Sequence, residues 1–280
     1  MRTLVLTASA LVCFAANSIL CRMALGTAAI DPATFSTVRL VSGAVALAIL
    51  ARILGRHGRP RPPGDWISAG MLFLYAAPFA FAYLWLSAGT GALILFGAVQ
   101  ATMIVAALRS GERPHHLEWG GLFVAIAGLT YLVLPGLEAP SPAGAVLMAG
   151  AGIAWGFYSL RGRAAADPLL DTAGNFARAV PLAAAVSAMA LPRLHLSFDG
   201  LVLATASGAL ASGLGYVLWY AALRGLTATR AATVQLPVPV LSAIGGVVVL
   251  SETITPRLVV ATVLVLGGVG LALRGRLSST

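Results

Sequence analysis

The stretch TVQLPVPVLSAIGG, residues Thr233–Gly246, lies within a long apolar run and contains one glutamine, two prolines and a glycine pair. Proline lacks a backbone N–H, so it interrupts a helix interior and is excluded from central strands. Pro239, for example, is expected to free the carbonyl of Gln235. Within a membrane, freed backbone groups are tolerated only where they are buried in protein or face a cavity. The stretch therefore predicts a bent membrane-spanning helix beside a cavity.

The composition of the chain is that of an integral membrane protein. Its 280 residues are 59% hydrophobic and 10% charged, whereas soluble domains carry about 25% charged residues. The formal net charge is +9, but no soluble region remains to present a basic surface to nucleic acid. We therefore expect an all-α, polytopic membrane protein that contacts membrane lipid and binds no nucleic acid.

Apolar segments of the length that a bilayer requires, about 20 residues, recur ten times along the chain. The expected spans are 3–24, 33–54, 66–87, 91–108, 117–134, 143–160, 172–191, 200–223, 229–250 and 257–274. The first segment has some features of a signal peptide, but its apolar run continues to Leu25, so we expect a span. Even spacing leaves no room for a soluble domain.

Arginine placement predicts the orientation of these spans. All 18 basic residues are Arg, and cytoplasmic segments of membrane proteins carry an excess of basic residues. With the N-terminus inside, 13 of them fall on the cytoplasmic side. The opposite side holds Arg22, Arg193 and Arg257, while Arg39 and Arg178 lie within spans. We therefore expect both termini in the cytoplasm, and the lack of lysine indicates a GC-rich bacterium and its inner membrane.

The two halves of the chain resemble each other at an offset near 140 residues. At that offset Glu112 falls on Glu252, and Asp31 falls on Asp171. Each half has five spans, an odd number, so the second half inserts upside down relative to the first. We expect two inverted five-helix repeats, residues 1–138 and 139–280, with a substrate site near the midplane between them.

Two stretches link this pattern to a known family. LRSGERPHHLEWGGLFVAIAGL (108–129) and VLSETITPRLVVATVLVLGGVGL (249–271) each place a glutamate before a glycine-rich span. With its ten spans and two halves, the whole chain resembles the EamA-type exporters of the drug/metabolite transporter superfamily. AYLWLSAGTGALILFGAVQ (82–100) and the Trp155–Tyr158 stretch are most similar to the aromatic amino-acid exporter branch. Phe14-Ala15 departs from the Trp-Gly that is common in the first span of the family.

The resemblance implies export of small metabolites by alternating access, with neutral and aromatic amino acids as the leading substrates. All nine acidic residues and all four histidines lie in expected loops or at span ends. Since an intramembrane carboxylate is the usual proton relay, we expect facilitated rather than carboxylate–proton-coupled export. No motif for a metal, a cofactor or a catalytic group is found, so we expect none of these and no enzymatic activity.

Aromatic and neutral polar side chains remain at membrane depth and would line a mostly apolar pocket, as in other small-molecule sites. Tyr75, Phe79 and Tyr83 recur on one helical face of the third span, and their rings suit an aromatic side chain or an organic cation. The expected substrate-binding residues are Asn17, Tyr75, Phe79, Tyr83, Gln100, Trp155, Tyr158, Tyr216 and Gln235.

Several of these aromatic and amide residues also have a structural interpretation. Tyr83, Trp85, Trp219 and Tyr220 lie near span ends, where an interfacial aromatic belt or packing is the preferred interpretation. Gln100 and Gln235 equally fit hydrogen bonding between helices.

Both halves are expected to bend at corresponding positions. Gly97 stands in the first half where Pro237 stands in the second, and interrupted segments at corresponding positions are typical of transporter sites. The expected hinge residues are Pro78, Gly97, Pro237 and Pro239.

Arg39 and Arg178 allow two interpretations. Either could capture a substrate carboxylate, or form a structural pair or a contact with backbone carbonyls where the two halves meet. The structural contact is preferred, because the resemblance places the second and seventh spans at the periphery.

The alternatives to amino-acid export are export of another solute, such as a cationic drug, nucleoside or sugar derivative, and a passive channel. We expect a monomer or a weak homodimer.

Overall fold

The computed structural model describes residues 2–55, 64–109, 116–134, 139–226 and 228–277, and nearly all of them are helical. In this part of the chain the only strand-like pairing is one isolated bridge between Ile30 and Leu196. The helices are α1 (Arg2–Gly26), α2 (Pro32–Ile53), α3 (Trp66–Ala82), α4 (Ala88–Arg109), α5 (His116–Val133), α6 (Pro142–Gly162), α7 (Pro168–Met189), η1 (Leu191–Arg193), α8 (Phe198–Ala206), η2 (Ser207–Leu214), α9 (Gly215–Leu223), α10 (Ala228–Val234), α11 (Pro237–Leu250) and α12 (Pro256–Leu277).

The all-α fold of ten expected spans is confirmed. Eight spans are single helices, the eighth is the continuous run α8–η2–α9, and the ninth is α10 followed by α11. Within the described residues, six helical runs are long and apolar enough to cross a membrane, and three further apolar helices are shorter. α7 has the length of a span but carries Asp171 and Arg178.

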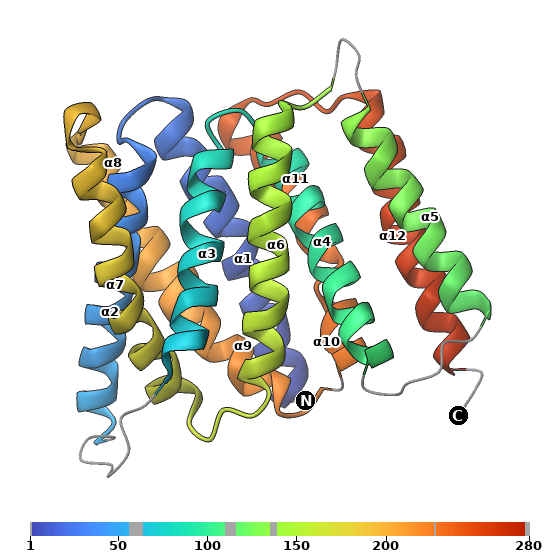
Figure 1. The fold of residues 1–280 in the computed structure, drawn as a ribbon, viewed down its shortest axis with the longest axis horizontal. Helices are drawn as coiled ribbons and strands as arrows, with labels where there is room; N and C mark the ends of the chain where they lie inside the picture. Colours follow the sequence, from blue (N-terminus) through green and yellow to red (C-terminus); the bar gives the residue numbers. More distant parts are fainter. Residues whose placement is uncertain (1, 56–63, 110–115, 135–138, 227, 278–280) are drawn as a thin grey trace.

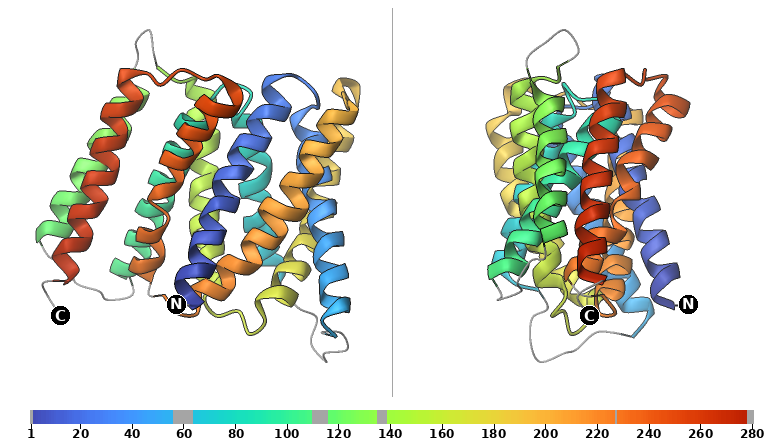
Figure 2. Two further views of the ribbon diagram at one scale, coloured as in Figure 1. Left: turned by 180° about the vertical axis from the view of Figure 1, so that it is seen from behind. Right: turned by 90° about the vertical axis from the view of Figure 1, so that its right-hand side faces the viewer.

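The spans lie side by side as one bundle, and α1 begins at the same end of the bundle at which α12 ends (Figure 1). α5 and α12 pack mainly against each other and form a pair at one edge, as all three views show (Figures 1 and 2).

The pattern of contacts between helices is the same when each span is replaced by the corresponding span of the other half. α3 packs on α6 as α1 packs on the α8–η2–α9 run, and α4 packs on α6 as α11 packs on α1. Three further pairs join corresponding spans of each half: α2 with α7, α4 with α11, and α5 with α12. The two halves are therefore interleaved rather than packed as separate units, and the centre of the bundle is built from both.

Side-chain caps explain where several helices begin. Asp31 and Asp65 accept hydrogen bonds from the backbone N–H of Thr34 and Ser68 at the starts of α2 and α3, which satisfies donors that a helix N-terminus leaves free. Asp167 caps α7 in the same way. The seventh helix consequently begins at Pro168, before the expected residue 172, and Asp171 lies in its first turn.

The middle of the eighth span is a π-helix, η2, which the sequence analysis did not predict. A Cβ atom added to Gly208 of this segment would overlap Ser42 Oγ and the carbonyl oxygen of Arg39 on α2. The glycine therefore lets the backbones of α2 and η2 come into direct contact, as small residues do between membrane helices.

Gly208→Ala is expected to destabilise the protein by about 1–3 kcal/mol, because the added methyl group forces α2 and η2 apart. Gly150→Ala is the matched control, since a Cβ there meets nothing within 4 Å and alanine favours a helix. Thermal unfolding of both variants in detergent checks this. Equal melting temperatures would contradict the account of the crossing.

Candidate functional site

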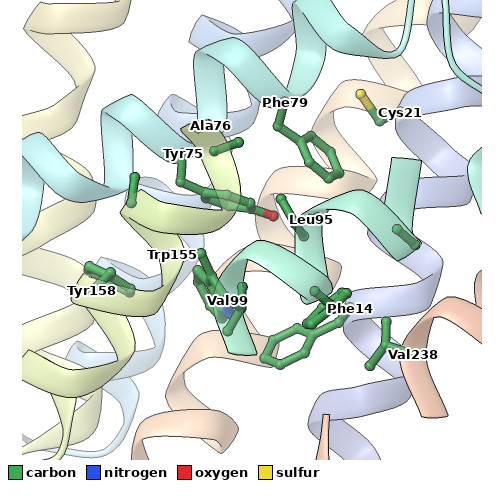
Figure 3. Close-up of a cluster of buried hydrophobic side chains, with 14 of the residues drawn as sticks. Phe14, Cys21, Tyr75, Ala76, Phe79, Leu95, Val99, Trp155, Tyr158 and Val238 are labelled. Carbon is green, nitrogen blue, oxygen red and sulfur yellow. The ribbon is translucent and has the colours of Figure 1, made fainter. Parts of the chain in front are cut away.

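A cluster of buried aromatic rings fills the centre of the bundle. We call Phe14, Tyr75, Phe79, Trp155, Tyr158 and Tyr216 the central cluster; all are at most 4% exposed. The ring of Trp155 is at its middle, with centroids 5.2 Å from Phe14, 5.0 Å from Tyr75 and 4.6 Å from Tyr216. Figure 3 shows Phe14, Tyr75 and Trp155 gathered between their helices. Both halves of the chain contribute rings, as the sequence predicts.

A network of hydrogen bonds runs along one side of this cluster. Asn17 Nδ2 donates to the hydroxyl of Tyr75 at 3.0 Å, and the Tyr216 hydroxyl lies 3.0 Å from that of Tyr75. Asn17 Oδ1 accepts from Ser207 Oγ at 2.6 Å. The network therefore ties α1, α3 and the eighth span together through neutral polar groups.

The π-helical geometry of η2 shapes this network. Ser207 and Ser212 are five residues apart, so they share a face only in a helix with the π repeat. Ser207 Oγ and Ser212 Oγ lie 2.6 and 3.4 Å from the same atom, Asn17 Oδ1. The sequence analysis missed both serines, because their common direction depends on a helix type that hydrophobic periodicity does not reveal.

Arg39 on α2 reaches into the central cluster. Its Nη2 donates to the hydroxyls of Tyr75 at 3.0 Å and Tyr216 at 2.6 Å, and its Nε donates to Ser212 Oγ at 2.8 Å. Two of these bonds join the halves, which is the structural contact that was preferred, although the side chain reaches further into the bundle than a peripheral second span suggests. Arg178, in contrast, donates to the carbonyl of Gly174 on its own helix, a backbone contact within α7.

The break between α10 and α11 also contacts Trp155. Gln235 sits in this break, where its Oε1 accepts from Trp155 Nε1 at 3.0 Å and its Nε2 donates to the carbonyl of Ala231 at 2.9 Å. Gln100 Nε2 donates to the carbonyl of Ala232. The bend expected from TVQLPVPV is present, and the two glutamine amides bond to its backbone or across helices.

The carbonyl of Gln235 is not free, contrary to the expectation from Pro239. It accepts from the backbone N–H of Val238 at 3.1 Å, because the chain tightens to an i→i+3 bond at the break.

The expected interruption of the fourth span is also wrong. α4 runs unbroken through Gly97, where an added Cβ would come within 2.7 Å of Leu129 on α5. The glycine makes room for a neighbouring helix there. α3 likewise continues past Pro78 to Ala82. The hinge roles of Pro78, Gly97, Pro237 and Pro239 concern motion and stay predictions.

Three aromatic residues near span ends are buried rather than exposed in an interfacial belt. Tyr83, Trp219 and Tyr220 are at most 1% exposed, whereas Trp85 is 51% exposed. Tyr83 packs edge-on against Phe79 with centroids 4.8 Å apart, which extends the central cluster towards one end of the bundle. These three residues are therefore not part of an interfacial belt, and only the exposure of Trp85 fits one.

Phe14 supplies an aromatic contact at the position where the sequence departs from its family. Its ring stands edge-on to Trp155 and Trp219 and stacks on Phe96. The family pattern, an aromatic residue at this position, was the signal that could have identified Phe14 as part of the site.

An ion pair joins the two halves at the end of the bundle where α3 finishes. Arg22 Nε lies 3.1 Å from Glu252 Oε1, and Arg22 Nη1 donates to the carbonyl of Tyr83. Glu252 Oε2 accepts from the backbone N–H of Ala88 at 2.9 Å. Arg22 and Glu252 line a cavity of about 440 Å³ that also contacts Thr90. We call this the Arg22–Glu252 pair.

A second ion pair joins the halves at the other end, where α3 begins. Arg161 Nη2 lies 3.0 Å from Asp65 Oδ1, and Arg161 Nε donates to Ser68 Oγ. Partial burial alone would raise the pKa of Asp65, but hydrogen bonds from Ser68 and Arg161 hold it below its usual range. The carboxylate is therefore ionised at neutral pH, and the stabilisation is lost only as the pH falls through that lowered pKa.

The two arginines of these pairs occupy corresponding places in the two halves, whereas their acidic partners do not. Arg22 lies near the end of α1 and Arg161 near the end of α6, and their separation of 139 residues is close to the repeat offset. Each arginine reaches an acid of the other half.

Comparison with known proteins gives matches along the whole chain. The sequence profile of the EamA-like transporter family matches residues 1–134 and 142–274, one match in each half. The chain belongs to the EamA-like transporter family. This family consists of multi-pass membrane transporters rather than enzymes, so the substrate is a small molecule.

The relatives of this EamA-like transporter include amino-acid exporters. An uncharacterized protein of Pseudomonas aeruginosa is 51% identical over 99% of this chain and 96% of its own length. A probable terminal-alkyne amino-acid exporter of Streptantibioticus cattleyicolor is 31% identical over 85% of this chain and 82% of that protein. The threonine/homoserine exporter of Escherichia coli is 34% identical, over 55% of this chain and 52% of that exporter.

A solved crystal structure has the same fold. It superimposes with a TM-score of 0.68 at 19% sequence identity and covers 98% of both chains. The likeness therefore extends over all ten spans.

Trp155→Ala is expected to lower the initial rate of transport at least tenfold. It removes the ring around which the central cluster packs, and it removes the hydrogen bond from the indole N–H to Gln235. Trp119→Ala is the matched control, since Trp119 on α5 is 45% exposed. Transport by equal amounts of folded protein in proteoliposomes checks this. Normal transport by a well-folded Trp155→Ala protein would show that the central cluster is not the substrate site.

Proposed function

We propose that this EamA-like transporter exports neutral amino acids, aromatic ones included, from the bacterial cytoplasm across the inner membrane. The observation that carries the proposal is the central cluster, a buried set of aromatic rings with amide and hydroxyl groups along one side, built from both halves. Two relatives that cover half or more of the chain are named as amino-acid exporters.

The chemistry of the cluster suits an amphipathic solute. Aromatic rings at contact distances favour an apolar or aromatic side chain, and Asn17 with the hydroxyls of Tyr75 and Tyr216 offers donors and acceptors to a polar backbone. The positive charge of Arg39, which lies over the rings of Tyr75 and Phe79 at 5.1 and 5.0 Å, disfavours an organic cation. Cationic drugs are therefore the weakest of the alternative substrates.

Transport would proceed by alternating access between the two halves, which we take as residues 1–138 and 139–280. The Arg22–Glu252 pair bridges the halves at one end of the bundle, and Arg161 and Asp65 bridge them at the other. Both pairs are formed in the structure, in which the central cluster is buried. Separation of one pair at a time would expose the site to one side at a time.

The orientation follows from the arginines. The end of the bundle at which α1 begins and α12 finishes (Figure 1) is taken as cytoplasmic, because most arginines lie in the segments that meet there. The Arg22–Glu252 pair then closes the periplasmic side, and Arg161 with Asp65 closes the cytoplasmic side.

Facilitated export is favoured over proton coupling. Among the described residues, the hydrogen-bonding groups in and around the central cluster are amides, hydroxyls, the indole N–H of Trp155 and the guanidinium of Arg39. None of these is a carboxylate, the usual proton relay within a membrane, so coupling through such a relay is not favoured.

Counterflow in proteoliposomes tests the function. Vesicles preloaded with one unlabelled neutral amino acid are expected to take up its radiolabelled form in a saturable way, at a rate that an imposed pH gradient does not change. A panel of aromatic and aliphatic amino acids, nucleosides and sugars ranks the substrates. Uptake that follows the pH gradient would contradict facilitated export, and flux without saturation or counterflow would indicate a channel.

Glu252→Gln is expected to open the periplasmic side more often, because it removes the charge that Arg22 binds. Loss of a partly exposed ion pair, about 1 kcal/mol, corresponds to about a fivefold shift between conformations. Cys21, a free and fully buried thiol next to Arg22, reports this opening by its rate of labelling with a membrane-impermeant maleimide in right-side-out vesicles.

Asp65→Asn is the matched control for this labelling experiment, since it weakens the pair at the cytoplasmic end. It should lower the labelling rate of Cys21 or leave it unchanged. Both proteins carry Cys13→Ser, so that only one thiol reacts. Equal acceleration by Glu252→Gln and Asp65→Asn would contradict the assignment of the two pairs to opposite sides.

A further inference from the structure

Arg39 occupies a position where a positive charge is unfavourable. It lies eight residues after Asp31, the cap of α2, which places it about 12 Å along the helix from its start. Its side chain is 1% exposed. A charged group at such a depth usually pairs with an opposite charge or reaches water.

The partners of Arg39 are all neutral. It donates to Ser212, Tyr75 and Tyr216, and among the described residues no carboxylate lies within ion-pair distance of it. Its Nη1 atom is buried and has no hydrogen-bond partner. The guanidinium therefore keeps an uncompensated charge and unused N–H donors in the centre of the bundle.

Other arginines of the chain show how a structural arginine is satisfied here. Arg22 and Arg161 each pair with an acid of the opposite half. Arg178, the other arginine within a span, donates to a carbonyl of its own helix. Arg39 has neither arrangement, and it is the one of these four whose side chain enters the central cluster.

The missing partner of Arg39 fits a carboxylate. Guanidinium binds carboxylate through two parallel N–H···O bonds, and Nη1 and Nη2 form such a pair of donors. Nη2 is shared with hydroxyls from both halves, Tyr75 on α3 and Tyr216 on α9. Movement of the halves apart would release this donor, while Nη1 is already free.

We propose that Arg39 binds the carboxylate of the transported solute, whose side chain then lies against the rings of Tyr75, Phe79 and Trp155. The inference rests on the proposed function and narrows it: the carboxylate is the group that the transporter requires. Amino-acid amides and esters would be poor substrates, although they keep the same side chain and the same ammonium group.

Paired substrates and Arg39 variants test the inference. Wild-type protein is expected to transport an amino acid with a kcat/KM about 10- to 100-fold above that of its amide, the range for one charge-assisted hydrogen bond or two. Arg39→Gln should reduce this ratio to within about threefold, mainly by slowing transport of the acid. Arg39→Lys keeps the charge and should retain part of the preference.

Arg178→Gln is the matched control, because it removes the other arginine within a span and should leave the ratio of acid to amide unchanged. Retention of the wild-type ratio by Arg39→Gln would overturn the inference. Equal transport of acid and amide by the wild-type protein would overturn it as well, and would leave amino-acid export standing.

A measurement on the wild-type protein covers the case in which Arg39→Gln does not fold. The melting temperature of the detergent-solubilised protein should rise with amino acids and not with their amides at equal concentration. A chloride series distinguishes a general anion site, which would also overturn the inference. If no amino acid is transported or stabilises the protein, the same comparison with other carboxylic acids and their amides separates failure of the proposed function from failure of the Arg39 assignment.

Discussion

The hydrogen bonds from Arg39 to the hydroxyls of Tyr75 and Tyr216 are the interaction on which the central site depends. A buried guanidinium in an apolar bundle must be hydrogen-bonded by protein groups, and these come from both halves. Gly208 lets α2 approach closely enough to place the arginine, and the π-helical turn of η2 brings Ser212 to its Nε. The geometry of three spans is thereby fixed by one charged side chain.

The sequence predicts the spans well because their signal is local: each needs about 20 apolar residues, and acids such as Asp31 begin the helices. The bend at TVQLPVPV is likewise predictable, since proline removes a hydrogen bond wherever it stands. The π segment, the burial of Trp219 and the location of Arg39 depend on which helices meet. Gly97 shows the same limit, because a glycine that bends a helix and a glycine that accommodates Leu129 are identical in sequence.

Polar groups are hydrogen-bonded both at the break in the ninth span and in the network around Arg39. Trp155 connects these two regions. On one side its indole N–H is bonded to Gln235 in the break between α10 and α11. On the other its ring contacts Tyr75 and Tyr216, the partners of Arg39. Movement of the second half at the break would therefore reach the arginine through one rigid ring, which gives the interrupted ninth span a defined role in the proposed cycle.

The most direct test is the structure of the protein with a bound neutral amino acid, determined by cryo-electron microscopy with a rigid fiducial. We expect density against the rings of Tyr75, Phe79 and Trp155, with the carboxylate at Arg39 and at least one of the two inter-half ion pairs intact. An amino acid bound only in the cavity beside Arg22 and Glu252, with the central cluster unchanged, would contradict it.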